Sequence, residues 1–417
     1  MKPAMQLPPG ATLAVSLEWD SSTVVPVGRL GMRGRQVLFE FDRQFLTDGV
    51  ELAPLHLRRR PGVIEIREPV FDNLPGVFAD SLPDGWGRLL LDRAARRNGI
   101  QPQTLTPLDR LAHVGRDGIG ALVYRPELGA DGSQDAIDLD RLADASRAVL
   151  DGTSDDSLDR LRAVGGSPQG ARPKALVQIE TDTGRVTDAQ HEHGPGWRHF
   201  MVKFASPMDF PDMGPVELAY ARMAAAAGVR IPAVRLLASQ HGHGFFASAR
   251  LDRDGDRRLH VATAAGLLHA DFRMPSLDYV DLAKLTVRLT QDHREGEQMF
   301  RLMAFNVLAH NRDDHAKQFS FLMDRTGAWT LAPAYDLTFA PGIAGEHTTS
   351  VAGEGKAPTL AHMHKVAEAA GLARQVADRI VEQTREAVRR WPETAAAAGV
   401  TEATAAEIGR VVGAGAT

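Results

Sequence analysis

The spacing of apolar residues predicts a chain that begins with strands. Three early segments alternate apolar and polar positions or are rich in β-branched residues, and turns containing Gly and Pro separate them. These segments are residues 12–19, 36–42 and 63–68. Residues 84–99 then change to a helical spacing, with Asp84 placed to cap the first turn and Gly99 placed after the last. The pattern predicts a small α/β subdomain over residues 1–125.

The pattern changes twice more along the chain. Residues 126–160 are rich in Asp, Gly and Ser and predict a connector with one helix. A glycine-rich turn and a strand follow over 164–180, and then come a strand, a helix and two further strands. These last four are expected at 198–206, 214–230, 231–239 and 244–253. Residues 161–258 therefore predict a mixed α/β lobe.

Residues 259–417 predict a helical lobe, except around 317–350. The tail over 361–411 is rich in Ala and amphipathic, which favours packed helices. No internal repeat is present. The order of elements predicts an α+β chain with a two-lobed, protein-kinase-like fold: a mixed α/β N-lobe, a helical C-lobe and an extra small α/β N-terminal subdomain.

A charged loop, HNRDDHAKQ at residues 310–318, follows an apolar helical pattern and precedes a short apolar segment. Protein kinases place a catalytic carboxylate five residues before an amide that binds metal, and a second metal-binding carboxylate lies further along. Gln318 follows Asp313 by five positions, and Asp336 follows it by 23. The spacing therefore favours phosphoryl transfer, with Asp313 as the catalytic group and Gln318 and Asp336 as Mg²⁺ ligands.

A kinase also needs a lysine on a strand and an acid on the next helix to orient it. Lys203 lies in the expected strand HFMVKF, and Glu217 opens the next expected helix 14 residues later. Only seven of the 48 basic residues are lysine. A lysine inside a motif of such a chain suggests a need for a compact point charge rather than the planar fork of arginine.

Composition narrows the function classes. The chain has 417 residues, a net charge of −5 and no cysteine. The acidic balance gives no support for direct binding of naked nucleic acid, and the missing cysteines exclude disulfides, a cysteine nucleophile and zinc–thiolate sites. No apolar run approaches the roughly 18 residues of a membrane helix, and the N-terminus does not read as a signal peptide. A cytoplasmic location without membrane association is the expectation.

An ordered set of motifs extends over nearly the whole chain. The motifs are FADSLPDGWGRLLLDR (78–93), GGSPQGARPKALV (165–177), HFMVKF (199–204), VELAYARMAAAAGV (216–229), HNRDDHAKQFSFL (310–322) and LAPAYDLTFA (331–340). Together they resemble the HipA family of serine/threonine kinases, the toxins of type II toxin–antitoxin modules. The resemblance implies ATP and Mg²⁺ as cofactors.

The resemblance also implies roles for individual residues. Asp313 would be the catalytic carboxylate, with His315 and Lys317 in the same active-site loop. Lys203, oriented by Glu217, would contact the nucleotide phosphates, and Asp336 would bind Mg²⁺. The residues that match the glycine-rich phosphate loop are Gly170, Ala171, Arg172 and Lys174. Ser167 matches the position of a regulatory autophosphorylation site.

One position departs from the family. The second metal ligand is commonly Asn, and here it is Gln318, which offers the same carbonyl on a longer arm to an ion that tolerates geometric error poorly. Two alternatives to the protein kinase therefore stay open. One is a catalytically weak binding module that acts with an antitoxin as a co-repressor, and the other is a small-molecule phosphotransferase on the same scaffold.

Other charged stretches have plainer interpretations. Asp313, Asp314 and His315 could be read as a metallohydrolase site, but adjacent residues rarely converge on one ion. The basic run at 56–60 is typical of a solvated face. The family implies a helix–turn–helix (Xre-like) antitoxin as partner, contact with DNA mainly through that antitoxin, and a protein substrate such as an aminoacyl-tRNA synthetase.

Overall fold

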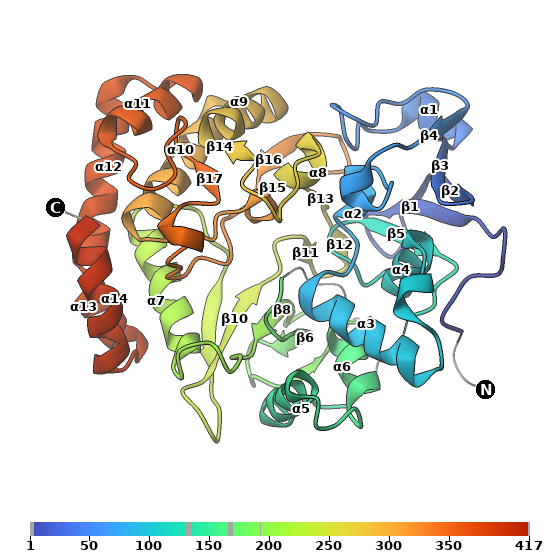
Figure 1. The fold of residues 1–417 in the computed structure, drawn as a ribbon, viewed down its shortest axis with the longest axis horizontal. Helices are drawn as coiled ribbons and strands as arrows, with labels where there is room; N and C mark the ends of the chain where they lie inside the picture. The colour runs from blue at the N-terminus through green and yellow to red at the C-terminus, as the bar shows by residue number, and fades with distance from the viewer. Residues whose placement is uncertain (1–3, 130–134, 166–169, 192, 416–417) are drawn as a thin grey trace.

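The computed structural model describes residues 4–129, 135–165, 170–191 and 193–415. Helices and sheets alternate along the chain, which gives a mixed α/β architecture (Figure 1). An N-terminal sheet lies at one side of the molecule, a second sheet lies below the centre, and the C-terminal helices stand on the opposite side. The two ends of the chain therefore lie far apart.

The N-terminal sheet has the strand order β4-β3-β2-β1-β5, with antiparallel neighbours. Its strands are β1 (Leu13–Glu18), β2 (Val24–Arg33), β3 (Gln36–Phe41), β4 (Val63–Glu65) and β5 (Leu122–Arg125). The helical elements of this region are α1 (Arg43–Asp48), η1 (Pro69–Phe71), α2 (Gly76–Ala79), α3 (Gly85–Arg97), η2 (Pro102–Thr104) and α4 (Pro107–Val114). The three expected early strands are confirmed as β1, β3 and β4.

The sequence pattern did not predict strand β2. Pro26, Gly28 and Gly31 interrupt it, and such residues weaken the usual signature of a strand interior. The pairing with β1 tolerates them because the register shifts between Val15 and Ser16, opposite Pro26. Tertiary pairing on both sides therefore overrides the local preference.

The second sheet has the order β7-β6-β8-β10-β9, also antiparallel. Its strands are β6 (Lys174–Glu180), β7 (Val186–Asp188), β8 (Trp197–Lys203), β9 (Val234–Leu237) and β10 (Phe245–Ala249). Helices α5 (Leu139–Asp151) and α6 (Leu158–Gly165) precede it, and α7 (Met213–Ala226) separates β8 from β9. Buried residues of α3, α5 and α6 share one core with β6, β8 and β10, so α3 packs with this sheet.

The remaining chain is mainly helical, as the apolar spacing predicts. Its helices are α8 (Ala264–Leu268), α9 (Tyr279–Thr290), α10 (His293–Leu308), η3 (Ala316–Gln318), η4 (Ile343–Gly345), α11 (Leu360–Ala369), α12 (Arg374–Arg389), α13 (Trp391–Ala398) and α14 (Glu402–Gly415). Its strands are β11 (Arg253–Asp254), β12 (Arg257–Arg258), β13 (His260–Thr263), β14 (Leu277–Asp278), β15 (Ser320–Met323), β16 (Trp329–Leu331) and β17 (Thr349–Ser350). The short apolar segment that follows the charged loop forms strand β15.

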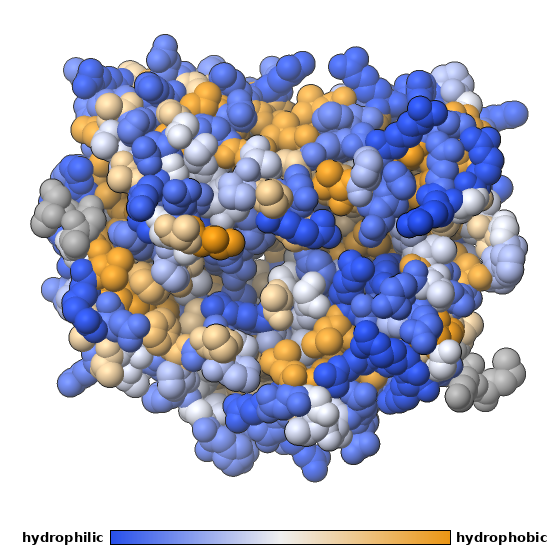
Figure 2. All heavy atoms as spheres, viewed as in Figure 1, coloured by the Kyte–Doolittle hydropathy of each residue, from blue (hydrophilic) through white to orange (hydrophobic). Residues whose placement is uncertain are grey.

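Hydrophilic residues cover much of the face in Figure 2, which is hollowed near its centre. Hydrophobic side chains on this face form small, separated patches rather than one broad surface. Within the described part of the chain, no helix combines the length and the apolar character that a membrane span requires.

Candidate functional site

A buried lysine lies at the centre of the site. Lys203 ends strand β8, and its Nζ donates to Oε1 of Glu217 on helix α7 at 2.7 Å. The same ammonium donates to Oδ1 of Asp336, which follows β16. The strand lysine and helix acid expected from the sequence therefore form an ion pair, and this pair also reaches the expected metal carboxylate.

The close charges fix the protonation states of this centre. Burial alone would lower the pKa of Lys203, but Asp336 and Glu217 outweigh it and raise the pKa. Burial alone would likewise raise the pKa of Asp336, but the positive charges of Lys203 and Lys174 hold it well below its usual range. The centre therefore contains an ammonium and a carboxylate at neutral pH.

Asp336 and Gln318 lie side by side. Nε2 of Gln318 donates to Oδ2 of Asp336 at 2.9 Å, so the two metal ligands expected from the sequence are neighbours. Asp336 has a φ of 56°, a left-handed conformation that non-glycine residues adopt rarely and that often marks functional positions.

The donor set of these two residues fits magnesium. Carboxylate and amide oxygens are the ligands that Mg²⁺ takes from proteins, usually one or two of them beside phosphates and waters. The Gln318 amide would have to turn over to present its oxygen, and Lys203 would have to release Oδ1 of Asp336. Both changes are local.

The neighbouring residue Asp314 anchors the charged loop that carries Asp313. Asp314 is completely buried and accepts hydrogen bonds from the Tyr279 hydroxyl at 2.8 Å, His347 Nδ1 at 2.9 Å and the Thr348 amide at 2.9 Å. Because these donors hold both of its oxygens, Asp314 anchors the loop. It is not placed to share an ion with Asp313, and in the described residues no group of three or more His, Asp or Glu could hold a metal.

Asp313 itself is exposed at the surface of this anchored loop. Partial burial of its carboxylate raises its pKa, and the negative charges of Asp336 and Asp314 add to this effect. The positive charges of His315 and Arg172 oppose the rise. Asp313 therefore presents a carboxylate with a raised pKa beside the negative charge of Asp336.

The expected phosphate loop enters the site from the start of β6. Lys174 is buried, and burial lowers its pKa to about 8. Arg172 pairs with Asp209 at 2.7 Å and contacts Glu217 at 3.4 Å, whereas Ala171 is exposed. Ser167, the expected autophosphorylation site, lies outside the described residues.

His315 and Lys317 lie near the C-terminal end of the charged loop. His315 accepts at Nδ1 from the Lys317 amide at 3.3 Å and so begins the short helix η3. Lys317 Nζ lies 4.1 Å from the centre of the Phe272 ring and donates to Oδ2 of Asp84 at 2.6 Å. The face of the Phe272 ring therefore stabilises the Lys317 ammonium through a cation–π contact.

Asp84 is a site residue that sequence reasoning missed. It was expected to cap helix α3, and it does occupy the N-cap position, but its side chain makes no hydrogen bond to that helix. Its carboxylate instead accepts from Lys317 and from the Gly170 amide, at 2.6 and 2.7 Å. The DG pair inside the motif DSLPDGW was the only local indication of an unusual turn.

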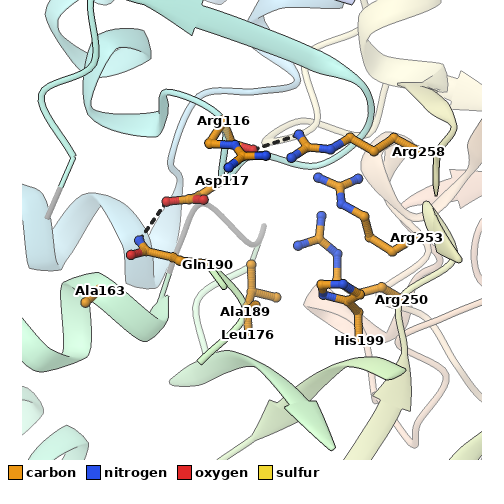
Figure 3. A pocket seen from close by; sticks show the side chains of 10 residues that line it. All are labelled: Arg116, Asp117, Ala163, Leu176, Ala189, Gln190, His199, Arg250, Arg253 and Arg258. Carbon is orange, nitrogen blue, oxygen red and sulfur yellow. Dashed lines mark hydrogen bonds between the residues drawn. The ribbon is translucent and has the colours of Figure 1, made fainter. Parts of the chain in front are cut away.

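A second charged cluster, which we call the arginine joint, contains none of these residues. It comprises Arg116, Arg250, Arg253 and Arg258 with the carboxylates of Glu18 and Asp252. Figure 3 shows the four arginines around a small hollow, where Arg258 also donates to the Arg116 carbonyl at 3.0 Å. None of the expected site residues that the structure describes lines this hollow.

The fold and site define a mixed α/β protein with a buried lysine–carboxylate centre beside an anchored, charged loop. Residues 166–391 match the HipA-like C-terminal domain, and residues 22–125 match the HipA N-terminal domain. The chain belongs to the HipA family.

Two known proteins extend the comparison. The HipA chain of a Shewanella oneidensis toxin–antitoxin complex with HipB and operator DNA superposes with a TM-score of 0.70. The superposition covers 97% of this chain and 96% of that chain at 15% identity, which shows a common fold. A Haemophilus influenzae protein named "Putative kinase" is 26% identical over 187 residues, 41% of this chain. The match spans about half the length of that relative, 52%.

Proposed function

We propose that this chain is an ATP- and Mg²⁺-dependent protein kinase that phosphorylates serine or threonine. The observation that carries the proposal is the position of Lys203, buried between Glu217 and Asp336, with Gln318 on the other oxygen of Asp336. This arrangement supplies a phosphate-binding cation next to a metal-binding pair. The kinase-named relative supports the same reaction class.

Each group has one part in the proposed transfer. Asp313 orients the acceptor hydroxyl and takes its proton, while that oxygen bonds to the γ-phosphorus of ATP. The bond from the γ-phosphorus to the bridging oxygen breaks, and ADP leaves with that oxygen. Lys203, Lys174 and the backbone around Gly170 hold phosphate oxygens, which carry the developing negative charge.

Mg²⁺ bound by Asp336 and Gln318 would neutralise charge on the phosphates. The anchor at Asp314 keeps the loop rigid, so Asp313 does not need to be ordered when substrate binds. Because magnesium requires near-ideal geometry, we expect the longer side chain of Gln318 to give a slower reaction than asparagine would.

The biological setting of the proposal is a toxin–antitoxin module. The Shewanella oneidensis protein of the same fold is complexed with HipB and operator DNA. We infer a helix–turn–helix antitoxin as partner, contact with DNA mainly through it, and a translation protein such as an aminoacyl-tRNA synthetase as the substrate whose modification halts growth.

The test is transfer of labelled phosphate from ATP by the wild type, Asp313→Asn and the surface control Asp281→Asn. We expect transfer by the wild type and the control, a loss of at least a hundredfold in Asp313→Asn, and unchanged ATP affinity by calorimetry. Mass spectrometry of the peptide that contains Ser167 reports autophosphorylation.

Two outcomes would favour the alternatives. ATP binding without transfer to any protein, not restored by Gln318→Asn, would contradict the kinase and favour the binding module. ATP consumption that depends on a metabolite, without phosphoprotein, would favour a small-molecule phosphotransferase.

A further inference from the structure

Residues 76–86 form a segment, which we call the docking arm, that reaches from the N-terminal region to the candidate site. Its root packs against helix α8, where Gly76 and Gly266 approach so closely that a Cβ on either would overlap the other backbone. Asp80 is buried there and accepts from the Thr263 amide and hydroxyl, each at 2.7 Å. The root is therefore fixed to the residue that caps α8.

The tip of the docking arm forms hydrogen bonds with both the amide and the carbonyl of Gly170. The Gly170 amide donates to Oδ1 of Asp84 at 2.7 Å, and the Trp86 amide donates to the Gly170 carbonyl at 3.0 Å. Gly85 between them has a φ of 40°, and a Cβ there would overlap Gly170. Only glycine at position 85 allows this approach.

The other oxygen of Asp84 reaches the charged loop. It accepts from Lys317 Nζ at 2.6 Å, and the Lys317 side chain is only 7% exposed. A single carboxylate from the docking arm thus joins two loops that are 147 positions apart in the chain, from Gly170 to Lys317. Bonds from charged groups to a carboxylate are about twice as strong as neutral ones, so this bridge restrains both loops.

We propose that Asp84 is a positioning residue that holds Gly170 and Lys317 at a fixed separation. Through Asp84, the N-terminal region forms part of the nucleotide site. Asp84 does not touch the reacting atoms. The consequence for ATP rests on the proposed kinase function, whereas the restraint on Gly170 does not.

The restraint is tested by hydrogen exchange of the Gly170 amide in the wild type, Asp84→Ala, Asp84→Asn and the exposed control Asp151→Ala. We expect exchange about tenfold faster in Asp84→Ala, equivalent to about 1.4 kcal/mol. Asp84→Asn keeps one oxygen acceptor and should stay within about threefold of the wild type, as should the control. Unchanged exchange in Asp84→Ala would overturn the proposal.

The effect on the nucleotide is tested by the KM for ATP and by kcat. Asp84→Asn should fold normally but lose the charge that fixes Lys317, so we expect the KM for ATP to rise and kcat to fall, each by about tenfold. Values within twofold of the wild type would refute the positioning role. If the wild type neither binds nor uses Mg-ATP, the proposed function fails, and the exchange experiment still decides whether Asp84 restrains Gly170.

Discussion

Two clusters of opposite charges are largely buried, but they use their cations differently. One is the arginine joint, and the other, the lysine centre, consists of Lys203, Glu217, Asp336 and the neighbouring Lys174. Around the candidate site lie Lys174, Lys203 and Lys317, three of the seven lysines in the chain. The other 41 of the 48 basic residues are arginines, and four of them form the arginine joint. Lysine is therefore concentrated where a ligand is proposed to bind.

The bonding of the two clusters explains the difference. Arg253 donates to the carbonyls of Gly118 and Gly120 and to Asp252, and Arg250 donates to Gly118 and to both oxygens of Asp252. The planar fork of arginine serves several fixed acceptors at once, which suits a permanent link between chain segments. An ammonium is a point charge that can exchange a carboxylate for a phosphate with little rearrangement.

The largest effect is expected from Asp252→Ala in the arginine joint. Asp252 is buried, and burial alone would raise its pKa, but Arg250 and Arg253 hold it well below the usual range. Removing one member of a buried ion network leaves the others uncompensated, at a cost of about 3–5 kcal/mol. Urea unfolding measures this loss, and the exposed Asp254→Ala is the matched control. A loss below about 1 kcal/mol would show that the joint is not a structural link.

In the lysine centre, by contrast, removing one charge should increase the free energy of unfolding. Burial lowers the pKa of Lys174 from 10.5 to about 8, so the unfolded chain holds this proton more tightly than the folded one. Lys174→Met removes that cost and should stabilise the protein at pH 7 by up to about 3 kcal/mol, at 1.36 kcal/mol per pKa unit. The same change should weaken ATP binding, because a phosphate contact is lost.

The pH dependence of this gain identifies its cause. The folded pKa is the lower one, so wild-type stability rises between pH 8 and pH 10.5 relative to Lys174→Met. The gain should therefore be complete at pH 7 and absent above about pH 10.5. Unfolding free energies at both pH values measure it, and a gain that persists at high pH would point to packing instead of charge.

Local patterns in the sequence predicted two pairs of groups at the lysine centre, but not the contact of Lys203 with Asp336, which are 133 positions apart. Lys203 ends strand β8 and Glu217 lies in the N-terminal half of α7, the next helix, so the two side chains meet although 14 residues separate them. Gln318 and Asp336 flank strands β15 and β16, which pair directly. Within each of these two pairs the residues are close in the sequence, and their side chains meet in the fold.

Contacts between remote segments could not be predicted. Asp84 lies 233 positions before Lys317, and its motif reads locally as a helix cap. The arginine joint likewise combines Glu18, Arg116 and Arg258, which no periodicity relates. Such pairs depend on how the N-terminal sheet sits on the rest of the molecule, and that packing is set by tertiary contacts.

The smallest effect that still separates the two clusters is expected from Arg253→Lys. The substitution keeps the charge and the apolar stem, but one ammonium cannot reach Gly118, Gly120 and Asp252 together. At least one buried carbonyl would lose its donor, which costs about 1–3 kcal/mol. Arg257→Lys, at an exposed position of the neighbouring strand β12, should change the unfolding free energy by less than about 0.5 kcal/mol. Equal effects of the two substitutions would mean that the joint needs only charge, and the contrast with the lysine centre would then be one of position rather than of bonding geometry.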